Sequence, residues 1–224
     1  MQTINSILAL FYKEYKMLFS NLYDLTSVLL FFLLGVLIFV FSIGTSKEIF
    51  DQINIGIIWT LLLFSANLTL KKIYQDDFND GNIFLLIISG LSLELIVLIK
   101  LIVYWSFFQL PFLIVIPLAA IILDIEIANL QLIIYTFLIS SPVLTSITSI
   151  SGSMNLLNNK NFAIASLIVM ILTIPLIIFS VGVINAPSEF IRPQLSILFG
   201  IFLFFLALTP WISATCIRIA LRNS

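Results

Sequence analysis

The thirty residues from Lys71 to Lys100, KKIYQDDFNDGNIFLLIISGLSLELIVLIK, decide how this chain is organised. The chain has ten basic and eleven acidic residues, and seven of these charged residues lie in this one segment. The stretches on either side of it are almost purely apolar. Charged side chains are costly inside a bilayer. We therefore expect the segment to leave the membrane and to be open to contact by a soluble partner.

The composition sets the class of the protein. Its 224 residues are 61% hydrophobic and only 9% charged, against about 25% charged residues in soluble domains. Such a chain cannot cover a core with a solvated surface, so we predict an all-α integral membrane protein with a single transmembrane domain over residues 1–224. The near-neutral charge balance gives no reason to expect nucleic acid as a partner. One cysteine, Cys216, and no histidine exclude a disulfide framework and a Cys/His zinc site.

Six segments reach the roughly 20 apolar residues that a membrane-spanning helix needs, and none contains Asp, Glu, Lys or Arg. They are residues 25–43, 53–70, 101–123, 127–150, 161–185 and 194–217. Six spans place both termini on the same side of the membrane. Eight basic residues fall on that side and two, Lys47 and Arg192, fall on the other. The positive-inside rule therefore predicts cytoplasmic N- and C-termini, or termini on the equivalent matrix side.

An amphipathic helix is predicted before the first span, over residues 4–20. At helical spacing its apolar side chains share one face: Ile4, Ile7, Leu8, Phe11, Tyr15 and Leu18. Ser6, Lys13, Lys16 and Ser20 fall on the other face. We expect this helix to lie in the membrane interface with its lysines toward anionic headgroups. The alternative is an irregular lead-in to the first span.

The fourth predicted span, residues 127–150, combines a proline with an unusual number of hydroxyl side chains. Proline removes a backbone donor and tends to bend a helix. The hydroxyls, from Thr136, Ser140, Ser141, Thr145, Ser146, Thr148 and Ser149, can bond within a helix or across to a neighbour. They allow two interpretations. Close packing between helices is one, and a translocation face is the other.

Between the second and third spans we predict a cytoplasmic coupling elbow, residues 71–94. A short helix ends at Asp80-Gly81, because glycine can take the left-handed conformation of a helix stop. An apolar run, 83–88, is too short to cross the bilayer. Ser92 can then cap a new helix with Glu94 in its first turn. A seventh span over residues 83–99 is the alternative, and the carboxylate of Glu94 disfavours it.

Residues 53–105 resemble the membrane subunit of the cytochrome c maturation ABC transporter, the haem exporter protein B or CcmB family. The residues that carry the resemblance are Gly56-Ile57-Ile58-Trp59, Asp76-Asp77 with Asp80-Gly81, Leu93-Glu94, Lys100, Trp105, Leu110-Pro111, Thr173-Ile174-Pro175-Leu176, Ile178-Phe179 and Pro210. The resemblance covers essentially the full length. The chain departs from the family pattern after Gly81, where the family more often has an acidic residue.

The resemblance implies a half-transporter that pairs with a second copy of itself and with a separate ATP-binding subunit. It also implies a haem-handling membrane partner and a haem chaperone that is released in an ATP-dependent step. The sequence agrees in one respect: no glycine is followed by lysine, so the chain has no phosphate-binding loop of its own. We therefore expect a non-catalytic subunit that binds no cofactor, with ATP and haem held by partners. Its location would be a bacterial inner membrane or a mitochondrial inner membrane.

Three other functions stay open at this stage. A membrane subunit that exports a lipid, a glycan or another small molecule would share these features. A passive assembly scaffold would have similar hydropathy but would not need an acidic elbow. A secondary transporter normally carries ionisable groups in mid-membrane, and the six predicted spans contain none.

The elbow is the candidate functional site. Seven residues are predicted to couple this chain to the ATPase: Tyr74, Asp76, Asp77, Phe78, Asp80, Gly81 and Glu94. We expect the three aspartates to present a carboxylate-rich surface to a cleft on the ATPase. Tyr74 and Phe78 would fill the apolar floor of that cleft, and Gly81 would hold the turn. The alternative is a solvated loop whose charges only keep the connection out of the membrane.

Overall fold

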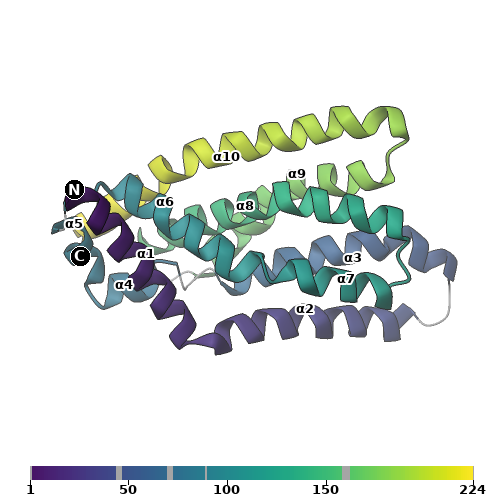
Figure 1. Ribbon diagram of the computed structural model, residues 1–224, viewed down its shortest axis with the longest axis horizontal. Helices are drawn as coiled ribbons and strands as arrows, with labels where there is room; N and C mark the ends of the chain where they lie inside the picture. Colours follow the sequence, from purple (N-terminus) through teal and green to yellow (C-terminus); the bar gives the residue numbers. More distant parts are fainter. Residues whose placement is uncertain (1, 44–46, 70–72, 89, 158–161, 224) are drawn as a thin grey trace.

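The computed structural model describes residues 2–43, 47–69, 73–88, 90–157 and 162–223, and these residues form helices and turns only. Leu70, Lys71, Lys72 and Lys160, which entered the sequence argument, lie outside the described residues. The long helices run side by side as one bundle (Figure 1). Both chain ends lie at the same end of that bundle, as an even number of spans requires.

The long helices are α2 (Leu22–Ile43), α3 (Lys47–Leu68), α8 (Ile127–Leu157), α9 (Phe162–Asn185), α10 (Ser188–Asn223) and the broken third span. That span comprises α6 (Leu93–Tyr104), the π-helix η1 (Trp105–Gln109) and α7 (Phe112–Ile122). Among the described residues, five helices are long and apolar enough to cross a membrane, and α3 contributes a shorter apolar stretch, Gln52–Leu68. The protein is therefore a multi-pass membrane protein.

Several helices extend beyond the predicted spans. The sixth was predicted over residues 194–217, whereas α10 runs from Ser188 to Asn223. The third was predicted from residue 101, but the structure starts it at Leu93. A hydropathy pattern marks only the hydrocarbon-facing part of a helix, and hydrogen bonding continues the helix into the interface. Glu94 and Lys100 consequently lie on the same helix as the third span, in the part that precedes the predicted residues 101–123.

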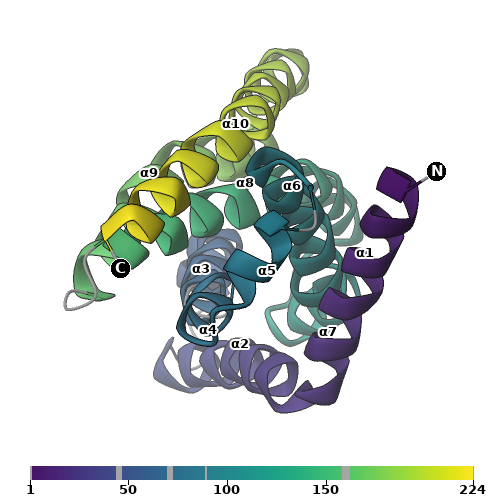
Figure 2. The same cartoon turned by 90° about the vertical axis from the view of Figure 1, so that its left-hand side faces the viewer.

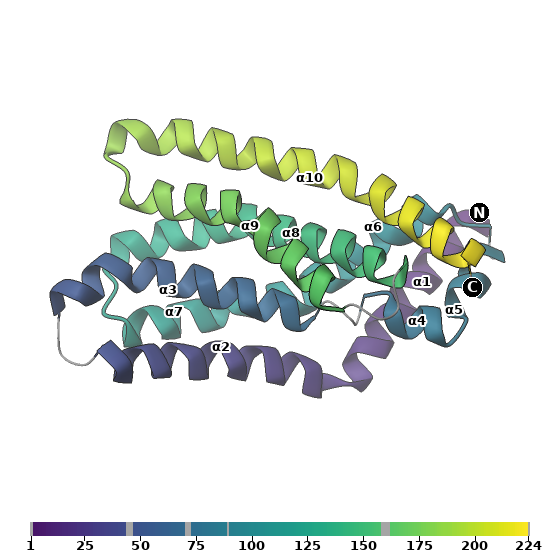
Figure 3. The ribbon, with the colours of Figure 1, turned by 180° about the vertical axis from the view of Figure 1, so that it is seen from behind.

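The end-on view shows how the short elements cover one end of the bundle (Figure 2). There α4 (Gln75–Asn79) and α5 (Asn82–Ile88) lie in front of the long helices, and α1 (Gln2–Ser20) runs along one side. Since α5 has only seven residues, the alternative of a seventh span over residues 83–99 was wrong. Seen from behind, α9 lies between α10 and α3 (Figure 3).

The amphipathic helix forms as predicted, and Ile7, Phe11, Tyr15 and Leu18 of its predicted apolar face pack into the core, together with residues that were not on that face. Leu10, Glu14 and Leu18 are buried, whereas Leu8 is 61% exposed. The helix packs on α6 of its own chain. Contact with another helix, rather than apolar spacing alone, therefore selects the buried face, and it brings a glutamate inside.

The hydroxyls of α8 act in helix packing. Ser140 pairs with Ser180 of α9 at 2.9 Å, and Ser149 pairs with Ser213 of α10 at 3.2 Å. Ser141 accepts a hydrogen bond from the indole nitrogen of Trp105 at 3.0 Å. These bonds connect α8 to α9, α10 and η1, and they support the packing interpretation for the three serines.

Candidate functional site

The elbow begins with α4, a single helical turn whose two sides have different environments. Asp76, Asn79 and Asp80 are exposed. Tyr74 and Asp77 turn inward and are 1% and 2% exposed. Residues three or four apart share a helix face, so one turn can present carboxylates to solvent while its other side contacts the bundle.

The turn after α4 has the predicted local geometry. Gly81 has a φ of 73°, in the left-handed region, and its amide donates to the carbonyl of Phe78 at 3.2 Å. A Cβ built at Gly81 would have no neighbour within 4 Å. The requirement for glycine is therefore one of backbone conformation and not of space.

The start of the third span is capped and tied to the C-terminal helix. The hydroxyl of Ser92 accepts from the amide of Leu95 at 3.4 Å, as the sequence predicted. Glu94 lies in the first turn of α6 and forms an ion pair with Arg218 of α10 at 3.0 Å. It is half-buried and connects two long helices, so its position favours a role inside the bundle.

Tyr74 forms a polar contact between the elbow and α8. Its hydroxyl pairs with Ser149 at 2.7 Å, and Ser149 pairs in turn with Ser213. Burial raises the pKa of Tyr74, so the hydroxyl keeps its proton. A second bond runs from the amide of Asn155 on α8 to Gln75 at 3.0 Å.

Asp77 belongs to a cluster of four charges that we name the ionic cluster: Lys13, Glu14, Asp77 and Lys100. The ammonium of Lys100 donates to Glu14 at 2.8 Å and also to Asp77. Lys13 donates to the second oxygen of Asp77 at 3.2 Å and lies 3.7 Å from Glu14. Two positive and two negative charges balance, and this compensation makes such deep burial tolerable.

The ionic cluster determines the protonation of Asp77. Burial alone would raise the pKa of its carboxyl group, but the ammonium of Lys100, followed by that of Lys13, outweighs burial and holds the pKa below its ordinary value. Glu14 and Lys100 are 0% and 1% exposed. Lys13 is 38% exposed and forms the solvent-facing edge of the cluster.

The structure corrects part of the predicted docking surface. Asp76 and Asp80 are exposed as expected, but Asp77 and Tyr74 are bonded inside the chain and do not contribute to that surface. Phe78 is partly buried and packs against the apolar core, so it is only partly available as an anchor. The physical reason is the short helix itself, because a single turn places about half of its side chains against whatever lies beneath it.

Sequence reasoning missed Lys13, Glu14 and Lys100 as members of the site. One signal was available for each of the two buried residues. Glu14 lies four residues after Leu10 and four before Leu18, which places a carboxylate on the buried face. Lys100 interrupts an otherwise apolar helix, and a lysine there requires an acidic partner.

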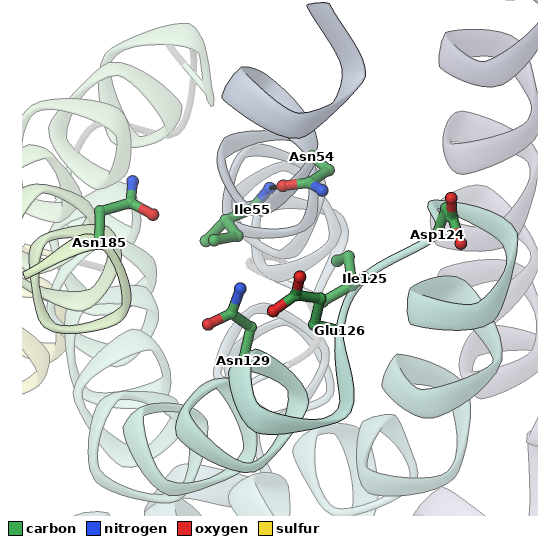
Figure 4. Close-up of a pocket in the computed structure, with 7 residues that line it drawn as sticks. All are labelled: Asn54, Ile55, Asp124, Ile125, Glu126, Asn129 and Asn185. Atoms are coloured by element: carbon green, nitrogen blue, oxygen red, sulfur yellow. Dashed lines mark hydrogen bonds between the residues drawn. The ribbon is translucent and has the colours of Figure 1, made fainter. Parts of the chain in front are cut away.

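A separate hollow of about 400 Å³ opens at the opposite end of the bundle (Figure 4). It lies between the start of α3, the α7–α8 connection and the end of α9. Its lining is polar apart from two isoleucines: Asn54, Ile55, Asp124, Ile125, Glu126, Asn129 and Asn185. Asp124 has a φ of 51° in the turn that follows α7.

Comparison with known proteins places this arrangement in a family. The sequence profile of the family described as CcmB protein matches residues 5–220. The chain is 31% identical over 202 residues to heme exporter protein B of Haemophilus influenzae, covering 89% of this chain and 91% of that protein. It is 29% identical to heme exporter protein B of Shigella flexneri, covering 95% and 98% of the two chains. The agreement extends over nearly the whole length on both sides, and the chain therefore belongs to the CcmB protein family.

Proposed function

We propose that this chain is the membrane subunit of an ABC exporter complex that serves haem export in c-type cytochrome maturation. Two observations support the proposal: the family assignment, and relatives named heme exporter protein B in several bacteria. A multi-pass helical bundle suits a subunit of a bacterial inner membrane. Within this proposal, two copies of the chain assemble with a separate ATP-binding subunit and with haem-handling partners.

The chain itself would be non-catalytic. Its sequence has no glycine followed by lysine and therefore lacks a phosphate-binding loop. Nucleotide hydrolysis would occur on the separate ATP-binding subunit. Haem would be handled by the membrane partner and by the chaperone whose release follows hydrolysis.

We assign docking of the ATP-binding subunit to the elbow. The observation that carries this assignment is the division of α4 into two sides. Outside, Asp76 and Asp80 are exposed carboxylates in reach of a soluble partner. Inside, Tyr74, Gln75 and Asp77 bond to α8 and to the ionic cluster. A force on the outer side would therefore reach several helices, whereas a solvated loop would need no such attachment.

Charge reversal on the outer side tests this assignment. We expect the double variant Asp76→Arg, Asp80→Arg to reduce the amount of ATP-binding subunit that co-purifies by about tenfold, because a cleft that binds carboxylates would not accept cations. A tenfold loss corresponds to about 1.4 kcal/mol of binding free energy. The comparison is made at matched membrane levels of this chain.

Glu189→Arg is the matched control. Glu189 is an exposed carboxylate in the first turn of α10, at the opposite end of the bundle. Retention should be unchanged in this variant. Full retention by the double variant would favour the solvated-loop interpretation. Phe78→Ala is less informative, because Phe78 also packs against the core.

A further inference from the structure

The ionic cluster joins three elements that are distant in sequence. Lys13 and Glu14 come from α1, Asp77 from α4, and Lys100 from α6. Lys100 donates to both carboxylates, so a single side chain holds the elbow and α1 to the third span. The ring of Tyr104 lies 5.9 Å below the same ammonium group. Each of the three elements is therefore tied to the other two by charge.

The same α1 helix also contacts the irregular part of the third span. Tyr15, the residue after Glu14, pairs with the hydroxyl of Ser106 in η1. One turn further along, the ring of Phe19 meets that of Phe107 at 5.2 Å in an edge-to-face contact. Thus α1 runs from the ionic cluster to η1, and it touches the third span at both points.

The η1 segment is the place where the third span can bend. A π-helical turn disrupts the regular ladder of hydrogen bonds and often occurs at functional sites. Pro111 lies two residues after its end and has no backbone donor. The part before η1 is fixed to the ionic cluster, whereas α7 beyond it packs against α2. Both halves of the span contact α8, but only α6 contacts α1 and α10, and only α7 and η1 contact α2, among the more extensive contacts.

From these contacts we propose that α1 is a moving part of the coupling device: Lys100 transmits displacement of the elbow to α1, and α1 carries it to η1. Lys100 is in this role a positioning residue. The inference deepens the proposed function and rests on docking of an ATPase at the elbow. It adds that an ionic link inside the chain, and not only the docking surface, is needed for nucleotide-driven movement.

The test measures that movement in the assembled complex. Spin labels are placed at Tyr12→Cys on α1 and Tyr135→Cys on α8, both exposed positions, in a Cys216→Ser background. Labelled chain is diluted with unlabelled chain so that only distances within one copy are recorded. We expect the distance distribution to shift when ATP and vanadate trap the ATPase. We expect Lys100→Met to retain the ATPase and to lose this shift.

Variants of Glu14 distinguish transmission from simple support. Glu14→Asp keeps a carboxylate for Lys100 and leaves the pair between Lys100 and Asp77 in place, and we expect it to keep at least half of the shift. Glu14→Gln, which preserves side-chain shape, should lose the shift as Lys100→Met does. Lys16→Met, which removes an exposed lysine from α1, should leave the shift unchanged.

The outcomes separate the two proposals. A normal shift in Lys100→Met and in Glu14→Gln would overturn the role of the ionic cluster and leave docking intact. So would the absence of any shift in a wild-type complex that retains the ATPase. If the wild-type chain retains no ATPase, docking at the elbow is contradicted, and transmission through the ionic cluster is contradicted with it.

Discussion

Lys100 lies in an apolar helix and is 1% exposed, yet its ammonium group donates hydrogen bonds to two carboxylates. A lysine alone at this depth would lose its proton or leave the core. Two acceptors from different elements keep it charged and in place. The bonds from Lys100 to Glu14 and Asp77 therefore explain why α1, α4 and α6 meet at this point. This region can pack as observed only when Lys100, Glu14 and Asp77 are in contact.

The pH response of Asp77 follows from the same contacts. Its pKa is lowered in the folded protein by Lys100 and Lys13, so its stabilising effect is fully present above the unfolded pKa of about 3.9. The effect is lost only as the pH falls through the lower folded pKa. We expect Asp77→Asn to destabilise the chain by about 3 kcal/mol.

That difference should stay constant between about pH 5 and pH 8 and shrink below about pH 4. Thermal unfolding of wild-type and variant chain in detergent, measured over this pH range, provides the comparison. A difference that changed near neutral pH would show that Asp77 is not the ionised partner in the cluster. Asp80→Asn serves as a control, since Asp80 is exposed.

At the scale of elements, the elbow depends on one backbone conformation. Gly81 ends the short helix α4 with a φ of 73°, and α5 begins at the next residue. The direction of α4 relative to α5 is therefore set at Gly81. Hydrogen bonds on the inner side of α4 then fix that direction against the bundle.

Substitution of Gly81 tests the backbone requirement without steric conflict, because open space surrounds the site. We expect Gly81→Val to cost about 1–3 kcal/mol, the usual strain of a side chain in the left-handed region, and to reduce co-purification of the ATPase. Gly81→Asn should be tolerated, since asparagine adopts this conformation more readily. Equal retention by both variants would mean that the turn does not direct the elbow.

At the scale of the whole molecule, the bundle has two chemically different ends. One end carries both chain termini, α1, α4 and α5 (Figure 1). The other carries the polar hollow, the α7–α8 connection and the α9–α10 connection. Lys13 and Lys16 of α1 and Arg218 and Arg222 of α10 lie at the end with the termini, and the positive-inside rule predicts that this end faces the cytoplasm.

Cysteine labelling tests this orientation. In a Cys216→Ser background, Asn79→Cys and Pro187→Cys are exposed positions near opposite ends of the bundle. An impermeant thiol reagent added outside intact cells should label Pro187→Cys and reach Asn79→Cys only after the membrane is opened. Labelling of both from the same side would rule out the orientation that docking at the elbow requires.

The amino-acid sequence by itself determined the class of the protein and the approximate positions of its spans. Long apolar stretches identify membrane helices because the bilayer sets their length. The turn at Asp80-Gly81 and the cap at Ser92 were also predictable, because both depend on local backbone geometry. Family membership was readable from motifs over the whole chain, such as Asp76-Asp77 with Asp80-Gly81.

Only the tertiary structure decided which side of the elbow faces inward. The sequence analysis placed Asp76, Asp77 and Asp80 together on an outward surface, whereas the fold turns Asp77 toward the bundle. The answer depends on Glu14 and Lys100, which are 63 residues before and 23 residues after Asp77 in sequence. Charges that compensate one another across such separations leave no local pattern, since each becomes tolerable only when its partners are in place.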